Sequence, residues 1–346
     1  MKNYIFIFSI LIILFKTGNV LSNNNIFNVN NIEISKKTYK NKENLVNQAF
    51  KKGFGELIER LLLEEDYKRL SSTNLTVIKE LISYYQIINQ EEKDKINEVK
   101  VNIFFDKGKM HDFFYKQNIL YSDIINTEII FFPLLVNKNQ FFIYSKNFFY
   151  ENWNSKNSQS LIEYNLPVES IENIKKIEDN KNDIYKLNVS NFFEEYNNSK
   201  MIFAIIEIEQ NEAKVFLNSK ISGKKLNKTL SIKFDGSNQV LSYNKVIIEI
   251  KKTIRDLIKS QNLIDVRTPS FLNVKIKLND KSNLVEFKNR TKDIGLINNY
   301  YIQQLNKDYA LVKIKYLGKI TKIIKKLKDQ NINLKFINGL WELNII

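Results

Sequence analysis

The sequence predicts an α+β protein of two to three small domains, and three observations support this fold class. Segments with apolar residues at every third or fourth position are interspersed with segments in which apolar and polar residues alternate, so both helices and strands are expected. Several strand-like segments follow one another across short turns, as antiparallel strands do. The length of 346 residues also exceeds what one hydrophobic core usually organises.

The composition restricts the class of protein. Hydrophobic residues make up 43% of the chain and aromatic residues 12%, enough apolar surface to offset the entropy lost on folding. The chain has no cysteine. This excludes disulfides, a thiol nucleophile, thiolate metal ligands and lipid attachment through an amino-terminal cysteine.

The formal net charge of +15 would ordinarily suggest nucleic acid or an anionic membrane as a partner. However, Lys, Asn, Ile and Phe are abundant while Gly (9) and Pro (3) are scarce, a bias typical of codons rich in A and T. Codon bias and a functional basic surface both remain open explanations of the charge. Arginine, the better phosphate ligand, occurs only at scattered positions, so we expect no nucleic-acid partner. These positions are Arg60, Arg69, Arg255, Arg267 and Arg290.

The first 22 residues have the pattern of an export signal. Lys2 provides the positive start, the apolar run extends from Tyr4 to Phe15, and Val20-Leu21-Ser22 is a small-residue cleavage site. We expect a signal peptide over 1–22 and a periplasmic protein that begins at Asn23. An uncleaved anchor is the alternative, although this apolar run is shorter than the ~20 residues that span a bilayer.

An amino-terminal α+β domain is expected over 23–126. Apolar residues at helical spacing, including Val46, Phe50 and Leu57, predict a long helix with one buried stripe. The expected elements are an edge strand over Ile26–Ser35, helices over Lys42–Leu63 and Leu75–Ile88, a strand over Val99–Phe105, a turn at Asp106–Gly108 and a short helix over Met110–Gln117.

A middle α/β domain with an antiparallel meander is expected over 127–265. Two apolar strands, Glu128–Val136 and Gln140–Tyr144, are joined by a turn at 137–139. The other expected elements are helices over Val168–Ile177, Ser190–Tyr196 and Tyr243–Lys259, and meander strands over Met201–Gln210, Ala213–Ile221 and Leu226–Phe234.

The carboxyl-terminal domain, 266–346, has the clearest pattern. Leu272, Val274, Ile276 and Leu278 alternate with polar residues, as in a strand with one buried face. Helix, strand, strand, helix and strand follow over Ser282–Ile294, Asn298–Gln304, Tyr309–Leu317, the segment after Gly318 and Asn333–Ile337. This β-α-β-β-α-β order is ferredoxin-like. We expect Asn338-Gly339 to turn the chain into a short last strand that contains Trp341.

No residue pattern predicts a catalytic, cofactor or metal site. His111 has no neighbouring ligands at metal spacing, and at the head of a short helix we expect it to be a surface or cap residue. Ser-x-x-Lys occurs at Ser222/Lys225 and Ser242/Lys245, but this spacing arises easily in a chain rich in both residues. The acidic pairs Glu64/Glu65, Glu91/Glu92 and Glu194/Glu195 are neighbours in sequence and do not face one another. The chain has no glycine-rich phosphate loop.

A basic helix face is the one candidate binding surface. It consists of Lys319, Lys322, Lys325, Lys326 and Lys328, opposite the apolar residues Ile320, Ile323, Ile324 and Leu327. Such a face can contact anionic lipid headgroups, or it can simply be the solvated side of a helix.

Several segments together resemble a known family. They are the export signal, the helix from Asn44 to Leu63 running into Asp66–Leu70, the strand and turn from Val99 to Asp106, and Trp341-Glu342-Leu343 near the carboxyl end. They resemble a family of proteobacterial envelope proteins with no assigned function, and the middle part is similar to the small domain at the amino terminus of the periplasmic protein TolB. The resemblance implies a periplasmic protein and offers no catalytic residue to transfer.

We therefore expect a non-enzymatic periplasmic protein that binds another envelope protein or the cell wall through sheet edges or grooves. One alternative is an envelope hydrolase that uses Asp/Glu or Ser-Lys chemistry. Another is a peripheral membrane protein bound through its basic faces, whose vesicle binding would depend steeply on salt. No cofactor is expected, and the partner and the oligomeric state are not predicted.

Overall fold

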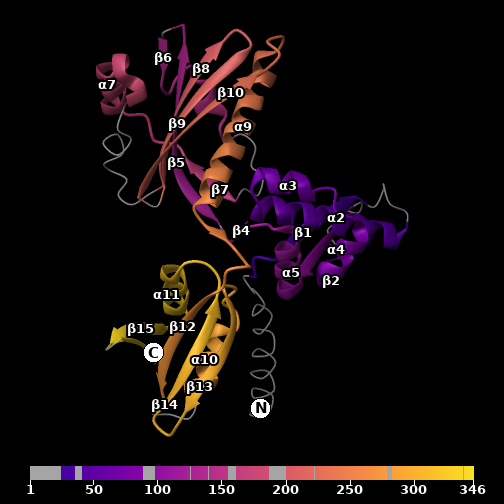
Figure 1. Ribbon diagram of the computed structural model, residues 1–346. Coiled ribbons are helices and arrows are strands. Elements are labelled where there is room, and N and C mark those ends of the chain that lie inside the picture. The colour runs from indigo at the N-terminus through magenta and orange to yellow at the C-terminus, as the bar shows by residue number, and fades with distance from the viewer. Residues whose placement is uncertain are drawn as a thin grey trace, which may run out of the picture. The chain divides into compact units, whose positions relative to one another are not determined.

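The computed structural model describes residues 25–35, 41–88, 98–124, 126–138, 140–154, 161–186, 200–221, 223–278, 283–337 and 339–346. The expected export signal, the helix expected over Ser190–Tyr196 and the start of the helix expected at Ser282 lie outside these residues. The described chain contains helices and several separate sheets, which confirms the α+β class (Figure 1).

The chain forms two compact units. The first consists of Met1–Asp123 together with Leu263–Ile346, and the second is Ile124–Asn262. The segments expected at 23–126 and 266–346 thus belong, apart from their ends, to one unit, on either side of the middle segment in the sequence.

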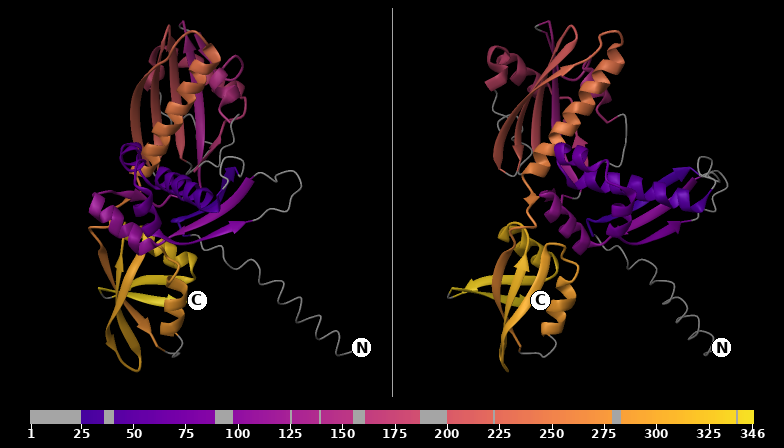
Figure 2. Two further views of the ribbon diagram at one scale, coloured as in Figure 1. Left: turned by 90° about the vertical axis from the view of Figure 1, so that its right-hand side faces the viewer. Right: turned by 45° about the vertical axis from the view of Figure 1, so that its right-hand side comes forward.

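The amino-terminal part of the first unit is an antiparallel sheet in the order β1-β3-β2 with α2 packed on one face (Figure 2). Strand β3 alternates buried and partly exposed residues, and the buried Val101 and Ile103 point toward α2. Gly53 allows the helix to approach closely, since a Cβ there would lie 2.6 Å from Cδ1 of Ile32 and 2.7 Å from Cδ1 of Ile103. The elements are β1 (Asn28–Ser35), α2 (Lys42–Leu61), α3 (Glu64–Leu70), α4 (Leu75–Leu81), β2 (Ile82–Ile88), β3 (Glu98–Phe105), α5 (Lys107–Gln117) and β4 (Tyr121–Ser122).

Two expectations for this part are wrong. The helix expected over Leu75–Ile88 ends at Leu81, and Ile82–Ile88 is instead strand β2, paired with β3. Its β-branched and aromatic residues favour a strand, and β3 supplies the partner. The turn expected at Asp106–Gly108 is the start of α5, because the Asp106 side chain caps the helix by accepting from the Lys109 amide at 2.9 Å.

The carboxyl-terminal part of the first unit is a sheet in the order β13-β14-β12-β16-β15. Helix α10 contacts β12 and β16, and α11 contacts β15. The short strand β11 pairs with β4 of the amino-terminal part. The elements are β11 (Leu263–Ile264), β12 (Ser270–Lys277), α10 (Asn283–Thr291), β13 (Ile297–Leu305), β14 (Tyr309–Tyr316), α11 (Ile320–Asp329), β15 (Ile332–Ile337) and β16 (Leu340–Ile345).

The ferredoxin-like arrangement expected for this part is not confirmed. The elements follow one another along the chain as expected, but the last strand, β16, lies between β12 and β15 in the sheet. Strand β16 pairs with β12 in parallel, through Val274↔Trp341 and Ile276↔Leu343. The second strand of the β15–β16 hairpin therefore pairs with β12, and the first strand lies at the end of the sheet.

The second unit has a sheet in the order β10-β9-β8-β5-β6, with β7 also paired to β5. The expected meander is present as β8, β9 and β10, antiparallel in sequence order. Helix α9 packs along this sheet (Figure 1), and α7 and η2 each add a buried residue to a second apolar cluster. The elements are β5 (Thr127–Asn137), β6 (Gln140–Phe142), α6 (Phe148–Asn152), β7 (Ile162–Asn165), α7 (Ile171–Asp179), the 3₁₀ helix η2 (Lys181–Lys186), β8 (Met201–Glu209), β9 (Glu212–Ile221), β10 (Lys224–Lys233) and α9 (Gln239–Ser260).

None of the helices in the described part of the chain is long and apolar enough to cross a membrane.

Candidate functional site

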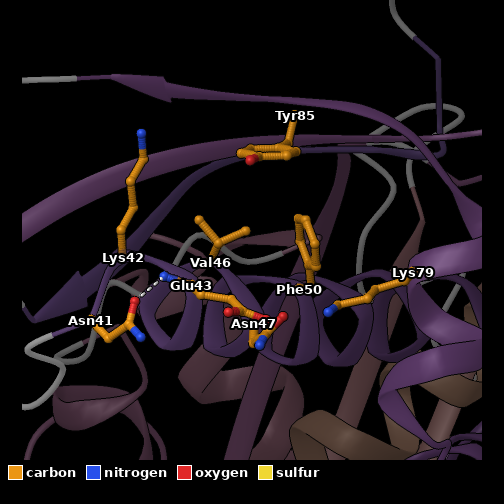
Figure 3. A pocket seen from close by; sticks show the side chains of 8 residues that line it. All are labelled: Asn41, Lys42, Glu43, Val46, Asn47, Phe50, Lys79 and Tyr85. Carbon is orange, nitrogen blue, oxygen red and sulfur yellow. Dashed lines mark hydrogen bonds between the residues drawn. The ribbon is translucent and has the colours of Figure 1, made fainter.

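A groove runs between α2 and β2 in the first unit (Figure 3). Its volume is about 480 Å³. The lining residues come from the start of α2, from α4 and from β2, and they are Asn41, Lys42, Glu43, Val46, Asn47, Phe50, Lys79 and Tyr85.

The centre of the groove is apolar. Val46 and Phe50 lie one turn apart on α2, and Tyr85 faces them from β2 (Figure 3). The rings of Phe50 and Tyr85 meet edge to face, with centroids 5.1 Å apart and planes at 79°. Phe50 is only 6% exposed, whereas Tyr85 is 43% exposed. The groove therefore has a fixed apolar floor and one aromatic wall that is open to solvent.

Two lysines flank this apolar centre. Lys42 lies in the first turn of α2 and Lys79 extends from α4 beside Phe50 (Figure 3). Both are exposed, and neither ammonium has an ion pair within the described part of the chain. The Asn41 side chain accepts from the Glu43 amide at 2.9 Å, which fixes the start of the helix and so the position of Lys42.

The outer edge of β2 is open in the part of the chain that the structure describes. Strand β2 is an end strand of its sheet, and Tyr84, Tyr85 and Ile88 on it are exposed. The opposite end strand, β1, is blocked, because side chains of α2 donate to main-chain carbonyls of β1 and of Ile26 just before it. Lys52 donates to Glu33 at 3.0 Å, and Arg60 donates to Ile26 at 2.6 Å and to Asn28 at 2.8 Å.

One end strand of the second unit's sheet, β10, differs from β2 in charge. It includes Lys224, Lys225, Lys228 and Lys233, and lysines on an edge strand discourage the addition of another strand. The sequence of β2, Ile-Ser-Tyr-Tyr-Gln-Ile-Ile, has no charged residue. Strand β2 is thus an uncharged edge beside an apolar groove.

The five lysines predicted as a binding face do not all lie free on the surface of α11. Lys322 forms an ion pair with Asp123, whose side chain is 6% exposed. Lys319, Lys325, Lys326 and Lys328 are exposed. Ile320, expected on the buried side, is 37% exposed, so the apolar stripe starts at Ile323.

His111 is not the surface residue that the sequence predicts. Because α5 begins at Lys107, His111 lies in its second turn and is 8% exposed. Its Nε2 atom is 3.1 Å from the Tyr121 hydroxyl, and its ring packs edge-on against Phe27. Burial, assisted by the charge of Lys107, lowers the pKa of His111 from 6.5 to about 4. This histidine is a neutral core residue at pH 7.

Ser242 and Lys245 do not form a nucleophile and its base. Ser242 donates to the carbonyl of Asp235 at 2.6 Å, while Lys245 donates to the carbonyl of Lys233 at 2.8 Å. Ser222 lies outside the described residues, as do the pairs Glu91/Glu92 and Glu194/Glu195. Glu64 forms an ion pair of 3.5 Å with Lys68 on α3. Among the described residues, no three His, Asp or Glu side chains are grouped to hold a metal ion.

A second hollow, of about 730 Å³, lies between α3, α4 and α5. Two of the three cations in its lining are already engaged, because Arg69 donates to the carbonyl of Gln117 at 3.1 Å and Lys109 to that of Glu80 at 2.9 Å; the third is Lys116. Asp112 and Glu80 add negative charge to its lining. This hollow is therefore less suited to binding an anion than the groove beside β2.

The sequence did not predict this groove, because Tyr85 fell within an expected helix. The run of Ile82, Tyr84, Tyr85, Ile87 and Ile88 is the signal that could have indicated the edge strand.

Comparisons with protein-family models, with curated proteins and with solved structures found no match to this chain.

Proposed function

We propose that this chain is a non-enzymatic binding protein of the periplasm that captures another envelope protein by adding an extended segment of that protein to β2. The observation that carries the proposal is the pairing of an open, uncharged edge strand with an apolar groove alongside it. The sheet's other edge is closed by Lys52 and Arg60, so a segment can add on one side only.

Strand addition is a recognised mode of protein binding in which main-chain and side-chain contacts have separate roles. Main-chain hydrogen bonds supply affinity that is independent of sequence, and a pocket beside the strand selects side chains. Alternate residues of the seven in β2 direct their main-chain groups outward, and each new hydrogen bond contributes about 1 kcal/mol net. The apolar side chain that enters the groove adds about 1.5–3 kcal/mol if it is fully buried.

The periplasmic setting is part of the proposal. The export pattern of residues 1–22 supports it. The resemblance to proteobacterial envelope proteins points to the same compartment. We also propose that the middle segment is similar to the amino-terminal domain of TolB, and that the cell wall is an alternative partner.

Site-specific photo-crosslinking in intact cells tests the function. A photoreactive residue replaces Gln86 on the open strand of the tagged full chain, with Lys326 on α11 as the matched surface control. We expect one recurrent protein adduct from position 86, in the periplasmic fraction, that is lost when Tyr85→Lys is added to place a charge at the groove. Equal adducts from both positions, or an adduct unchanged by Tyr85→Lys, would overturn the proposal. A lipid adduct from position 326 alone would favour the peripheral-membrane alternative.

A further inference from the structure

We infer that the segment captured at β2 has the pattern acidic, any residue, apolar, any residue, acidic. This inference rests on the proposed function and specifies the chemistry of its partner. It follows from the length of the groove, its apolar centre and the charge at its two ends.

The length of the groove sets the spacing. Lys42 and Phe50 are eight residues apart on α2, which corresponds to about 12 Å along the helix axis. Lys79 lies beside Phe50, so the two lysines flank a stretch of about this length (Figure 3). An extended chain advances about 3.3 Å per residue, so four residues cover the same distance. Residues i, i+2 and i+4 of a strand also point to the same side.

The lining sets the chemistry of those three positions. The central side chain meets Val46, Phe50 and Tyr85, which form an apolar surface that buries a residue such as leucine. The outer two side chains meet Lys42 and Lys79, which have no ion pair within the described part of the chain. Glu43 also lines the groove, and Figure 3 shows its side chain at the level of α2 on the side where the Lys79 ammonium also lies, whereas Lys42 rises toward the strand.

The net charge of the whole chain also favours an acidic partner. The formal charge of the full sequence is +15, of which residues 1–22 contribute only Lys2 and Lys16, so an acidic segment is attracted to the mature chain from a distance before it reaches the groove. A second copy of this chain carries the same excess of positive charge, which argues against self-association as the main use of this edge.

Three synthetic peptides, each labelled with a fluorophore and capped at both ends, test the inference by fluorescence anisotropy with the full mature chain. The first has the core Asp-Thr-Leu-Thr-Glu, the second Lys-Thr-Leu-Thr-Lys, and the third Asp-Thr-Ser-Thr-Glu. We expect saturable binding of the first and binding at least about tenfold weaker for the other two. Binding of the first peptide should weaken as salt is raised.

Charge exchange in the protein completes the test. The double variant Lys42→Glu/Lys79→Glu should prefer the lysine peptide, whereas Lys51→Glu, an exposed α2 residue outside the groove lining, should keep the original preference. Circular dichroism verifies that each variant is folded. No saturable binding of the acidic peptide, equal binding of all three peptides, or an unchanged preference in the double variant overturns the inference. Concentration-dependent dimerisation abolished by Tyr85→Lys overturns it in favour of a second copy as the occupant.

The two failures are distinguishable. If the crosslinked partner at position 86 is lost in Tyr85→Lys but the peptides bind alike, strand addition stands and the acidic pattern is wrong. If Tyr85→Lys leaves that adduct unchanged, the proposed function itself is wrong.

Discussion

Arg60 of α2 donates to the main-chain carbonyl of Asn28 in β1, at 2.8 Å. The same nitrogen donates to Ile26 at 2.6 Å, and Lys52, two turns earlier on the helix, donates to Glu33 at 3.0 Å. Since α2 packs across the sheet, its long cationic side chains reach the edge formed by β1. The helix whose side chains cover one edge of the sheet thus also forms the apolar floor of the groove at the other edge.

Replacing Arg60 with methionine should open the β1 edge. Methionine keeps an unbranched apolar chain but cannot donate to the two carbonyls, so we expect a loss of about 1–3 kcal/mol in the free energy of unfolding. The exposed edge should also promote self-association. Urea denaturation measures the first effect and sedimentation velocity the second.

Lys52→Met is the matched control, because Lys52 is exposed and donates to one carbonyl only. We expect a loss of less than about 1 kcal/mol for it. If Arg60→Met self-associates no more than the unmodified chain and is as stable, the side chain does not protect this edge.

His111 should make the stability of the first unit sensitive to mild acid. Its pKa is about 4 in the folded chain because burial disfavours the charged ring, whereas the ordinary value is 6.5. The unfolded state therefore binds more protons between these two pH values, so stability falls as the pH drops from 6.5 to 4. The maximum effect is of the order of 3 kcal/mol, from 1.36 kcal/mol per pKa unit.

The variant His111→Phe isolates this contribution, since carboxyl groups titrate in part of the same range in both proteins. We expect the difference in unfolding free energy between the two proteins to shift by about 2–3 kcal/mol in favour of the variant from pH 7 to pH 4. Urea denaturation at a series of pH values measures it. Parallel stability curves would show that His111 is protonated equally in the folded and unfolded states.

Lys322 should contribute to stability more than to surface binding. It neutralises Asp123, which is nearly fully buried, so Lys322→Ala leaves a carboxylate without its cation. We expect a loss of about 1–3 kcal/mol, against less than about 0.5 kcal/mol for Lys326→Ala on the exposed side of the same helix. Thermal unfolding of both variants measures the difference, and Asp123→Asn combined with Lys322→Met should recover part of the loss. Equal melting temperatures for the two single variants would mean that the ion pair has no structural role.

The sequence predicts the helices and strands whose residue pattern is sufficient by itself. It fails where pairing with a segment distant in the sequence determines the structure. Strand β3 and helix α2 follow from alternation and from the stripe that contains Val46 and Phe50. The residues from Ile82 to Ile88 are ambiguous alone, and pairing with β3 makes them a strand. The insertion of β16 beside β12 is equally invisible, because the two strands are separated by the rest of the carboxyl-terminal part. The groove depends on two such long-range features, the position of β2 at the edge of the sheet and its approach to α2.

Asn147 illustrates a third kind of information that sequence patterns omit. Its side chain is fully buried in the second unit, where Nδ2 lies within hydrogen-bond distance of the carbonyls of Pro133, Phe142 and Ile143, at 2.8–2.9 Å. Its Oδ1 accepts from the amides of Phe149 and Tyr150 and so caps α6. One amide therefore joins β5, β6 and the following helix, although asparagine is common in this chain and nothing near position 147 distinguishes it.

Replacing Asn147 with aspartate should destabilise the second unit severely. The carboxylate retains the cap of α6, but it places a buried negative charge against the carbonyl oxygens that Nδ2 serves. We expect a loss of more than about 3 kcal/mol near neutral pH, because a buried polar group without partners costs 1–3 kcal/mol and a charge costs more. Asn147→Ser, which keeps a capping oxygen and loses the donors without adding charge, should lose less. Trp153 is buried in the same unit directly after α6, so its fluorescence follows unfolding in urea once the second tryptophan, Trp341 of the first unit, is replaced by phenylalanine. An aspartate variant as stable as the serine variant would contradict the expected cost of a buried charge beside these carbonyls.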